Sequence, residues 1–201
     1  MQKEISNFGD KAVVTMQSNV SGQETVGMEG VYHVVCRDAD GNIKWEEKFP
    51  NLVNAVGKQL MLDTLLSGSA YTTVGPYLGL ISGASPTFAA SDTMSSHGGW
   101  TEFTNYTVGG SAVRGTATFS AATSSGTTPT NVTTKTASAI TYTITGAGGT
   151  VGGCFLVTGP GASSTQSNTS GTLYSAGAFA TAKITTIGDT VSVTYSTTAT
   201  S

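Results

Sequence analysis

Short runs rich in β-branched and aromatic residues, separated by turn-forming residues, occupy most of this chain from residue 30 onward. Runs of this length between clusters of Gly, Asn, Asp, Ser and Pro are typical of β-strands. Residues 43–49 alternate between apolar and polar, and the turn cluster DADGN separates them from residues 31–36, which predicts a β-hairpin. The strands that we expect are residues 31–36, 43–49, 77–82, 100–106, 112–121, 138–145, 152–158, 172–180 and 189–198.

One segment, at about residues 54–66, follows the spacing of a helix instead. Its apolar residues recur at intervals of three, four and seven positions. Asn51 or Asn54 can cap the start of this helix, and Gly68 can end it.

The apolar stripe of this segment predicts a helix that lies flat on a sheet, and Leu62 and Leu66 widen the stripe. Gly57 costs about 1 kcal/mol relative to Ala inside a helix. We therefore expect another stretch of backbone to approach the helix closely at Gly57.

About nine strands with one short helix predict an all-β fold, and their spacing favours a β-sandwich of the jelly-roll type. A Greek-key or immunoglobulin-like strand order stays open at this point. We expect the sandwich domain to comprise residues 30–201. Residues 1–29 have no helical stripe. Such a segment can form an edge strand or an extended arm that becomes ordered only against a partner, and we expect an N-terminal arm.

Charge is distributed unevenly along the chain. Seventeen of the twenty-one Asp, Glu, Lys and Arg residues lie in residues 1–102, and the remainder are Arg114, Lys135, Lys183 and Asp189. Soluble monomers normally carry charged surfaces that suppress association. A second half rich in Ser, Thr and Gly therefore suggests surfaces for protein contact, or alternatively strands that hydroxyl groups keep solvated. The net charge of −3 gives no electrostatic drive toward nucleic acid.

The two cysteines, Cys36 and Cys154, each lie in an apolar run, which is typical of buried free thiols, although a disulfide between them stays open. No apolar run approaches the roughly 18 residues of a membrane helix, so we expect no membrane partner. The first ten residues lack the apolar segment of a secretory signal peptide. Free thiols and the lack of such a segment fit a reducing compartment, where thiols stay reduced.

The stretch SDTMSSHGGWTEFTNY, residues 91–106, concentrates the residue types that active sites use, including Asp92, His97, Trp100 and Glu102. We interpret it as a structural loop. The Asp92 side chain can bond the neighbouring backbone, the two glycines after His97 can supply a reversal with positive φ, and Trp100 can anchor a strand. In this interpretation Asp92 and Glu102 help to hold the loop.

This stretch allows three other interpretations. A metal site is not indicated, because His97 lacks a second His or a Cys at ligand spacing, although it could pair with Asp92 or Glu102. A sugar-acting enzyme would need the carboxylates of Asp92 and Glu102 roughly 5–9.5 Å apart across a cleft. The rings of Trp100, Tyr106 and Tyr77 could stack on sugars if they were exposed.

His33, the second histidine, lies on an expected strand, where a packed or surface role fits better than catalysis. No nucleophile elbow, phosphate-binding loop or dinucleotide-binding fingerprint is present. The sequence therefore predicts no enzyme activity, no catalytic residue, no metal and no cofactor.

Several segments in a fixed order carry a resemblance to a known family. They are EGVYHVVCRDADGNIKWEEKFPNLVNAVGKQLMLDTLL, PYLGLI, SDTMSSHGGWTE and GCFLVTG…NTSGTLYSAGAF…GDTVSVTY. Together they span Glu29 to Tyr195 and resemble a family of small virion proteins of tailed bacteriophages, interpreted as capsid decoration or cement proteins. The resemblance implies a β-rich protein on the capsid exterior that binds the major capsid protein and locks neighbouring capsomers. It also implies assembly in the cytoplasm of a host bacterium, which the expected free thiols fit. It carries no catalytic residue over to this chain.

Residues 1–28 fall outside the strongest resemblance, and we expect them to contact the capsid or a sister subunit. The side chains expected to make this contact are Lys3, Phe8, Lys11, Val13, Val14 and Met16. We also expect a homodimer or homotrimer at a local symmetry axis. The alternative is a phage tail component or a receptor- or glycan-binding tip protein, for which residues 122–137 would form a variable loop.

Overall fold

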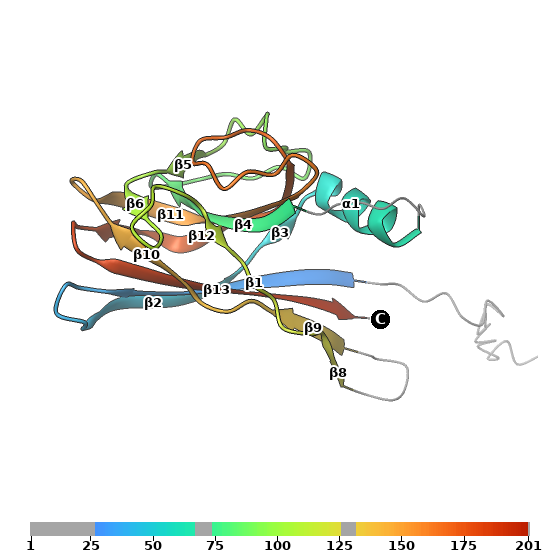
Figure 1. Cartoon of the computed structure of the whole chain (residues 1–201), viewed down its shortest axis with the longest axis horizontal. Helices are drawn as coiled ribbons and strands as arrows, with labels where there is room; N and C mark the ends of the chain where they lie inside the picture. Colours follow the sequence, from blue (N-terminus) through green and yellow to red (C-terminus); the bar gives the residue numbers. More distant parts are fainter. Residues whose placement is uncertain (1–26, 67–73, 126–131, 201) are drawn as a thin grey trace, which may run out of the picture.

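The computed structural model describes residues 27–66, 74–125 and 132–200, which form two β-sheets packed face to face with one helix beside them (Figure 1). The strands are β1 (Gly27–Arg37), β2 (Ile43–Pro50), β3 (Leu52–Val53), β4 (Val74–Ser82), β5 (Thr101–Phe103), β6 (Tyr106–Thr107), β7 (Gly115–Thr116), β8 (Thr123–Ser125), β9 (Val132–Thr136), β10 (Ile140–Ile144), β11 (Gly149–Gly159), β12 (Thr172–Thr185) and β13 (Thr190–Thr200), and the helix is α1 (Ala55–Leu66). The predicted all-β sandwich with one short helix is confirmed.

Both sheets are antiparallel. Sheet A has the order β2–β1–β13–β10–β6, with β9 beside β13 and β8 beside β9, and sheet B has the order β3–β12–β11–β4–β5, with β7 beside β4. Two hairpins, β1–β2 and β11–β12, each stay within one sheet. A jelly roll is built from two Greek keys. The jelly-roll type of this sandwich stays a prediction.

Two of the expected strands are organised differently in the structure. Residues 100–106 divide into β5 and β6, because the chain crosses from sheet B to sheet A between Phe103 and Tyr106. Residues 112–121 contain only the two-residue β7, since the backbone N–H of Arg114 donates to the Ser164 carbonyl at 2.7 Å instead of to a strand. The short strands β3, β8 and β9 were not expected.

The boundary expected between residues 29 and 30 falls inside β1. This strand begins at Gly27 and pairs with β13 along its whole length, from Gly27 opposite Thr200 to Arg37 opposite Thr190. Residues 27–29 therefore belong to the sandwich. The remainder of the expected arm lies outside the described residues.

The main core lies between the sheets and contains tyrosines that link them. Tyr32 in sheet A is fully buried, and its hydroxyl bonds with the Ser175 hydroxyl of sheet B at 2.9 Å. The Tyr142 hydroxyl donates to the Leu78 carbonyl at 2.7 Å in the same way. Burial raises the pKa of both phenols, so they remain neutral donors.

A second apolar cluster lies on the outer face of sheet B. Residues 151–157 of β11 are all buried, so this strand is covered on both of its faces. The loops at residues 83–100 and 160–171 supply the cover, and their Met94, Trp100 and Ala162 pack over Phe155 and its neighbours. Figure 1 shows these loops above β4 and β11. The outer face of sheet A has no corresponding cover among the described residues.

The helix matches its expected range but not its expected packing. Asn54 precedes it, and only Gly57 and Leu60 are buried, against the start of β12. The close approach expected at Gly57 is confirmed, because a Cβ there would lie 2.7 Å from the Tyr174 carbonyl oxygen. The expectation that Leu62 and Leu66 widen a buried stripe is wrong, since the last turns extend beyond the sheet and leave both side chains exposed.

Both cysteines are free and buried, as the apolar runs around them predicted. Burial raises the pKa of the Cys36 thiol to about 11 and also raises that of Cys154. In the part of the chain that the structure describes, no helix is long and apolar enough to cross a bilayer.

Candidate functional site

The loop between β4 and β5 begins with a turn that is attached to the start of α1. The Asp92 carboxylate accepts the backbone N–H of Ala89 at 3.0 Å. The Asn54 amide donates to the carbonyls of Ala89 and Asp92 at 3.1 and 3.3 Å, and the backbone N–H of Ala55 donates to the Ala90 carbonyl. Asp92 therefore closes a local turn and, through its carbonyl, joins the loop to the helix.

His97 and Trp100 form the next part of the loop. Their rings stack with centroids 3.8 Å apart and planes 16° from parallel, and His97 Nδ1 lies 3.1 Å from the Trp100 carbonyl oxygen. Trp100 packs against Phe155 of β11. His97 thus covers one face of the indole, and no described contact joins it to Asp92 or Glu102.

The two glycines between His97 and Trp100 do not form the reversal with positive φ that we expected. Neither Gly98 nor Gly99 has a positive φ, so the expected left-handed reversal is wrong. A Cβ on Gly99 would lie 2.3 Å from the Thr87 carbonyl oxygen, whereas a Cβ on Gly98 would meet nothing within 4 Å. Close approach of two backbone segments requires the glycine at position 99.

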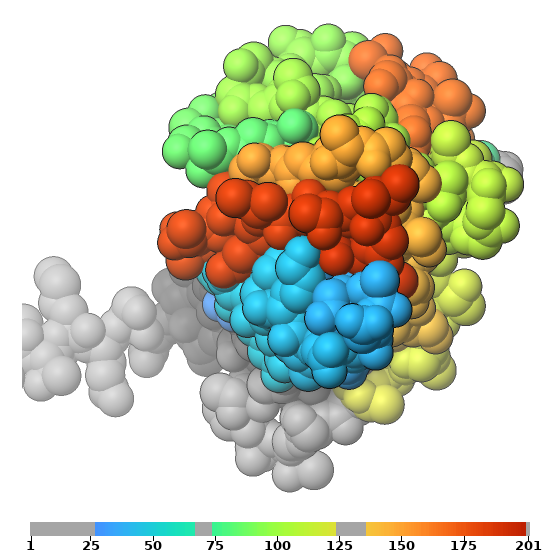
Figure 2. Space-filling view, turned by 90° about the vertical axis from the view of Figure 1, so that its left-hand side faces the viewer, coloured from blue at the N-terminus to red at the C-terminus, as the bar shows by residue number. Residues whose placement is uncertain are grey.

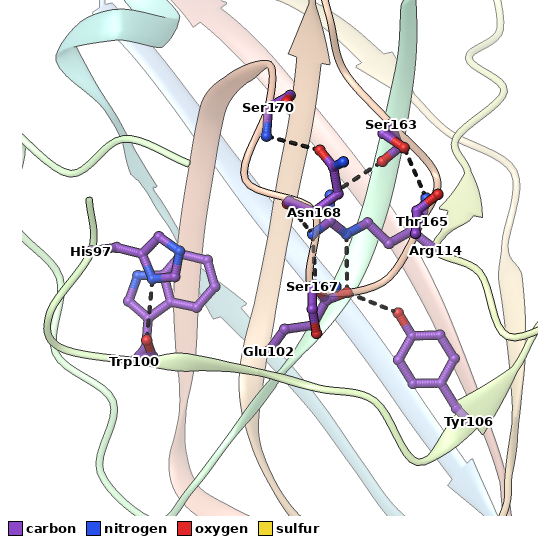
Figure 3. A network of polar contacts seen from close by, with 10 residues as sticks. All are labelled: His97, Trp100, Glu102, Tyr106, Arg114, Ser163, Thr165, Ser167, Asn168 and Ser170. Atoms are coloured by element: carbon purple, nitrogen blue, oxygen red, sulfur yellow. Dashed lines mark hydrogen bonds and ion pairs between the residues drawn. The ribbon is translucent and has the colours of Figure 1, made fainter. Parts of the chain in front are cut away.

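Glu102 lies at the centre of a buried polar network (Figure 3). Arg114 binds it through two hydrogen bonds, from Nε to Oε1 at 3.0 Å and from Nη2 to Oε2 at 2.7 Å. The Glu102 side chain is 7% exposed and the Arg114 side chain is 1% exposed. The Tyr106 hydroxyl donates to Oε1 at 3.4 Å, and the Ser167 backbone N–H donates to Oε2 at 2.7 Å. These four donors occupy the roughly four acceptor positions of an ionised carboxylate.

Arg114 extends the network to the loop at residues 160–171. Its Nη1 donates to the Ser163 carbonyl at 3.1 Å, and its Nη2 donates to the Asn168 carbonyl at 2.7 Å. Its guanidinium carbon also lies 5.1 Å from the centre of the Phe155 ring. Ser167 has a φ of 61°, a left-handed conformation uncommon outside glycine, and its N–H points to Glu102. The ion pair between Glu102 and Arg114 therefore holds the loop at residues 160–171 in place, although this loop lies about fifty residues after Arg114 in the sequence.

The same network affects Tyr106. Burial raises the pKa of its hydroxyl, and the negative charge of Glu102 raises it further. The phenol therefore stays protonated and donates to the carboxylate. This network holds the loop at residues 160–171, because its polar side-chain atoms bond to one another and to backbone groups of that loop.

The four predicted loop residues do not form one cluster of reactive groups. Asp92 bonds to its own turn, His97 to Trp100, and Glu102 to Arg114. Glu102 is saturated by donors, so it lacks the free lone pair that a nucleophile or general base would need. Among the described residues, no group of three or more His, Cys, Asp or Glu side chains is placed to hold a metal ion.

The three aromatic rings that could form a sugar-binding platform differ in exposure. Trp100 and Tyr106 are 5% and 1% exposed, so their faces are not open for stacking, and Tyr77 is half-buried against the second cluster. A hollow of about 230 Å³ beside the ion pair is smaller than the roughly 300–1,000 Å³ of typical ligand pockets. It is lined by Met94, His97, Trp100, Thr101, Glu102, Arg114, Ser167, Asn168 and Thr169.

The second histidine lies on the surface of sheet A. His33 Nε2 is 2.7 Å from Glu46 Oε1 across the β1–β2 hairpin, and both side chains are partly exposed. The predicted contact residues Lys3, Phe8, Lys11, Val13, Val14 and Met16 all lie outside the described residues.

Arg114 is the residue that sequence reasoning missed. It is one of four charged residues after Glu102, and it is the only charged residue in the run AVRGTATF. An isolated charge in such a run signals a buried ion pair, because a buried charge requires a partner. The partner itself could not be identified from sequence.

Comparisons of this chain with models of protein families, with curated proteins and with solved structures found no significant match.

Proposed function

We propose that this protein is a structural component of a tailed-bacteriophage virion that binds the outer surface of the assembled capsid and cements neighbouring capsomers. The partner would be the major capsid protein, and the location the capsid exterior. The proposal rests on the sequence resemblance together with one structural observation, the uncovered and hydroxyl-rich outer face of sheet A.

The outer face of sheet A follows from the alternation of β13. Val191, Val193 and Tyr195 are fully buried toward sheet B, so the intervening residues face outward. The outward residues of β13 and β10 are Thr190, Ser192, Thr194, Ser196, Thr141 and Thr143. None of these side chains carries a charge.

The hydroxyl groups on this face are arranged by bonds between strands. The Thr141 and Ser192 hydroxyls are 3.2 Å apart, and the Thr136 and Ser196 hydroxyls are 2.9 Å apart. Charged residues of β2, such as Lys48 and Glu46, lie at one margin of the face. On β1, between β2 and β13, Glu29 and His33, the latter in contact with Glu46, lie on the same outer face. The part of the face formed by β13 and β10 is therefore polar and uncharged, and the part formed by β1 and β2 carries charged side chains.

Such a surface suits attachment to another protein. Burying an uncharged hydroxyl costs far less than burying an unpaired charge, and a partner can satisfy it with a hydrogen bond. Loops cover the outer face of the other sheet, so among the described residues the outer face of sheet A is the uncovered one. Cementing then follows from linkage, since a protein that binds only the assembled shell raises the threshold for its disruption.

Attachment at several capsid subunits would not require a tight single contact. Specific interfaces bury about 1,200–2,000 Å². Linked contacts gain an avidity of about 100-fold or more through effective concentration. The residues Lys3, Phe8, Lys11, Val13, Val14 and Met16 remain our proposed second contact.

The test is co-sedimentation with purified, expanded phage heads that lack this protein. The variant T141K/T194K places two charges on the outer face of sheet A and is expected to lose at least 10-fold in head binding. The control T165K makes the same exchange on an exposed residue of the loop over sheet B and should bind like the wild type. Normal binding by the double variant, or equal loss by the control, would contradict the proposed face.

Removal of residues 1–26 tests the second contact without cutting β1, which begins at Gly27. We expect this truncation to abolish head binding while its unfolding temperature stays close to that of the full chain. Labelling on intact virions separates the head from the alternative, a tail component or glycan-binding tip, because the label would then lie at the tail end. If the wild type neither pellets with heads nor labels the capsid, the proposed function fails.

A further inference from the structure

The strand β2 forms an edge of sheet A. One side of this eight-residue strand pairs with β1, and among the described residues no strand pairs with its other side. Figure 2 views the molecule from the end that carries the β1–β2 turn and shows this hairpin at the margin of the molecule. An edge strand presents unpaired backbone N–H and C=O groups, which can pair with a strand of another chain.

The backbone groups of Glu46 and Lys48 point toward this edge. The N–H of Asn51 donates to the Gly30 carbonyl of β1 at 3.0 Å, so the backbone of Asn51 points toward β1. The register between the two strands is unbroken from Pro50 back to Glu46. Backbone groups of successive residues in an antiparallel strand alternate between its two sides. Those of Lys48 and Glu46 therefore point away from β1.

The side chains of these two residues carry opposite charges and are exposed on the outer face of sheet A. Trp45 and Phe49, one position before and one after them, pack into the core, and alternation along the strand turns Glu46 and Lys48 outward. Lys48 lies directly opposite His33 of β1, and it takes part in no ion pair among the described residues. Its own chain therefore supplies no acidic partner for Lys48.

We propose that β2 pairs in antiparallel fashion with β2 of a second copy, so that sheet A continues across a two-fold axis. In this contact Glu46 of each copy lies directly opposite Lys48 of the other. Opposite charges placed in this way stabilise a pair of strands. Because the same two residues have outward-pointing backbone groups, each pair also exchanges both of its backbone hydrogen bonds.

Charge selects this register over its neighbours. A slide by two residues in one direction places Glu46 opposite Glu46, and in the other direction it places Lys48 opposite Lys48; like charges directly opposite destabilise the pair. A slide by one residue turns the side chains of one strand to the wrong face. A slide by four residues aligns Glu46 with Lys44, but Lys44 Nζ already lies 2.6 Å from Asp189 Oδ2.

The two-fold axis of this contact passes beside Glu47, whose carboxylate faces sheet B. Lys183 Nζ lies 2.8 Å from this carboxylate, and the backbone N–H of Ala180 donates to it at 2.7 Å. Its charge is therefore neutralised within each copy. On the same inner face the partly buried Trp45 lies opposite Phe49 of the second copy, as an aromatic cross-strand pair. The contact thus adds apolar packing to the backbone bonds and ion pairs.

Lysine and proline on an edge strand normally discourage pairing with other chains. In β2, Glu46 accompanies Lys48, so the edge repels its own copy in the neighbouring registers and accepts it in one. Repulsion in the wrong arrangements is a common source of specificity. The outer face of sheet A stays open in the dimer. The inference does not rest on capsid binding and goes beyond it by naming the self-contact.

Charge reversals in the full-length chain test this register. E46K and K48E each place like charges opposite one another at both pairs, and each is expected to raise the dissociation constant of the dimer by about 10-fold or more. The double reversal E46K/K48E restores opposite charges and should dimerise like the wild type. An equal mixture of E46K and K48E should form a heterodimer, because every pair in it is of opposite charge.

Two controls separate the contact from general effects of the substitutions. H33A removes the 2.7 Å contact between His33 and Glu46, which E46K also loses, and should dimerise like the wild type. K58E makes a charge reversal on an exposed residue of α1 and should also leave the dimer unchanged. Circular dichroism and thermal unfolding establish that each variant is folded.

Light scattering coupled to size exclusion, over a range of protein concentrations, measures the assembly, and native mass spectrometry identifies the heterodimer. We expect the wild type to reach twice the 20.4 kDa of the chain. A wild type that stays monomeric at every concentration, or that forms a trimer, overturns the contact. So do single reversals that dimerise with wild-type affinity, a folded E46K/K48E that stays monomeric, or a mixture that does not associate. Head binding is measured separately by co-sedimentation, so failure here is distinguishable from failure of the proposed function.

Discussion

At the scale of single residues, Glu102 and Arg114 hold together parts of the chain that are distant in sequence. Glu102 is on β5, Arg114 directly precedes β7, and the carbonyls that Arg114 binds belong to the loop over sheet B. Removing one partner of a buried ion pair is far more damaging than removing both, because the remaining charge has no compensation.

The variant Arg114→Met is expected to lose about 3–5 kcal/mol of unfolding free energy, since it leaves the Glu102 carboxylate buried and unpaired. Urea unfolding at pH 7 measures the loss. The double variant R114M/E102L removes both charges and should recover a substantial part of it. Equal losses in the single and the double variant would show that the pair does not act as a unit.

Gly98 and Gly99 provide a matched pair of positions. Gly99→Ala is expected to destabilise the protein by about 1–3 kcal/mol, because its new methyl group would overlap the Thr87 carbonyl oxygen. Gly98→Ala introduces the same methyl group into open space and should change the stability by less than about 0.5 kcal/mol. Thermal unfolding of both variants tests the difference, and similar shifts for the two would contradict the contact with Thr87.

At the scale of elements, the helix α1 shows how a neighbour can reverse the preference of a residue. Helix propensity alone favours Ala over Gly at position 57 by about 1 kcal/mol. The Tyr174 backbone occupies the space that a methyl group would need. We therefore expect Gly57→Ala to destabilise the protein, by about 1–3 kcal/mol. Denaturant unfolding gives the sign, and a stabilised variant would contradict the close packing of α1 on β12.

The ion pair between Lys44 and Asp189 connects two further elements, β2 and the β12–β13 turn. Burial alone would raise the pKa of the Asp189 carboxyl, but hydrogen bonds from Lys44 and the Thr186 backbone hold it below its ordinary value of 3.8. A carboxyl with a depressed pKa stabilises the folded state above its ordinary pKa. This contribution disappears as the pH falls through the folded-state value.

Asp189→Asn is accordingly expected to lose about 1–2 kcal/mol at pH 7, and the difference from the wild type should shrink as the pH falls below about 4. Unfolding free energies measured between pH 7 and pH 2.5 test this course. The control Asp40→Asn, at an exposed position of the β1–β2 turn, should stay within about 0.5 kcal/mol of the wild type at pH 7. A difference that is constant with pH would exclude the ionised carboxyl as its cause.

At the scale of the whole molecule, the two thiols report on the integrity of the sandwich. Cys36 is on β1 of sheet A and Cys154 on β11 of sheet B, and both belong to the core between the sheets. With a pKa of about 11, only about one Cys36 thiol in a thousand is ionised at pH 8. Reaching either thiol requires the two sheets to separate.

We expect a thiol reagent at pH 8 to label neither cysteine in the native protein and to label both in denaturant. At intermediate denaturant concentrations the two should react in step, because one cooperative opening exposes them. Mass spectrometry of the labelled protein identifies the site. Rapid labelling of one cysteine alone in native conditions would contradict a single closed core.

Much of the fold was predictable from the sequence because it depends on local periodicity. The alternation of residues 43–49, the helical spacing of residues 54–66 and the apolar surroundings of Cys36 and Cys154 are properties of neighbouring residues, and each was confirmed. The contacts of the candidate site were less predictable from the sequence. The sequence singled out Glu102, but its saturation by Arg114 and Ser167 depends on which strands and loops become neighbours.

Tertiary structure alone decided the features in which residues far apart in the chain meet. It placed Thr87 against Gly99 and Tyr174 against Gly57, and it left Leu65 and Leu66 beyond the edge of the sheet. The local pattern determines whether a segment prefers to form a helix or a strand. The hydrophobic effect favours burial of every apolar face that results. Which face is finally covered depends on the order of the strands, and that order is a property of the whole chain.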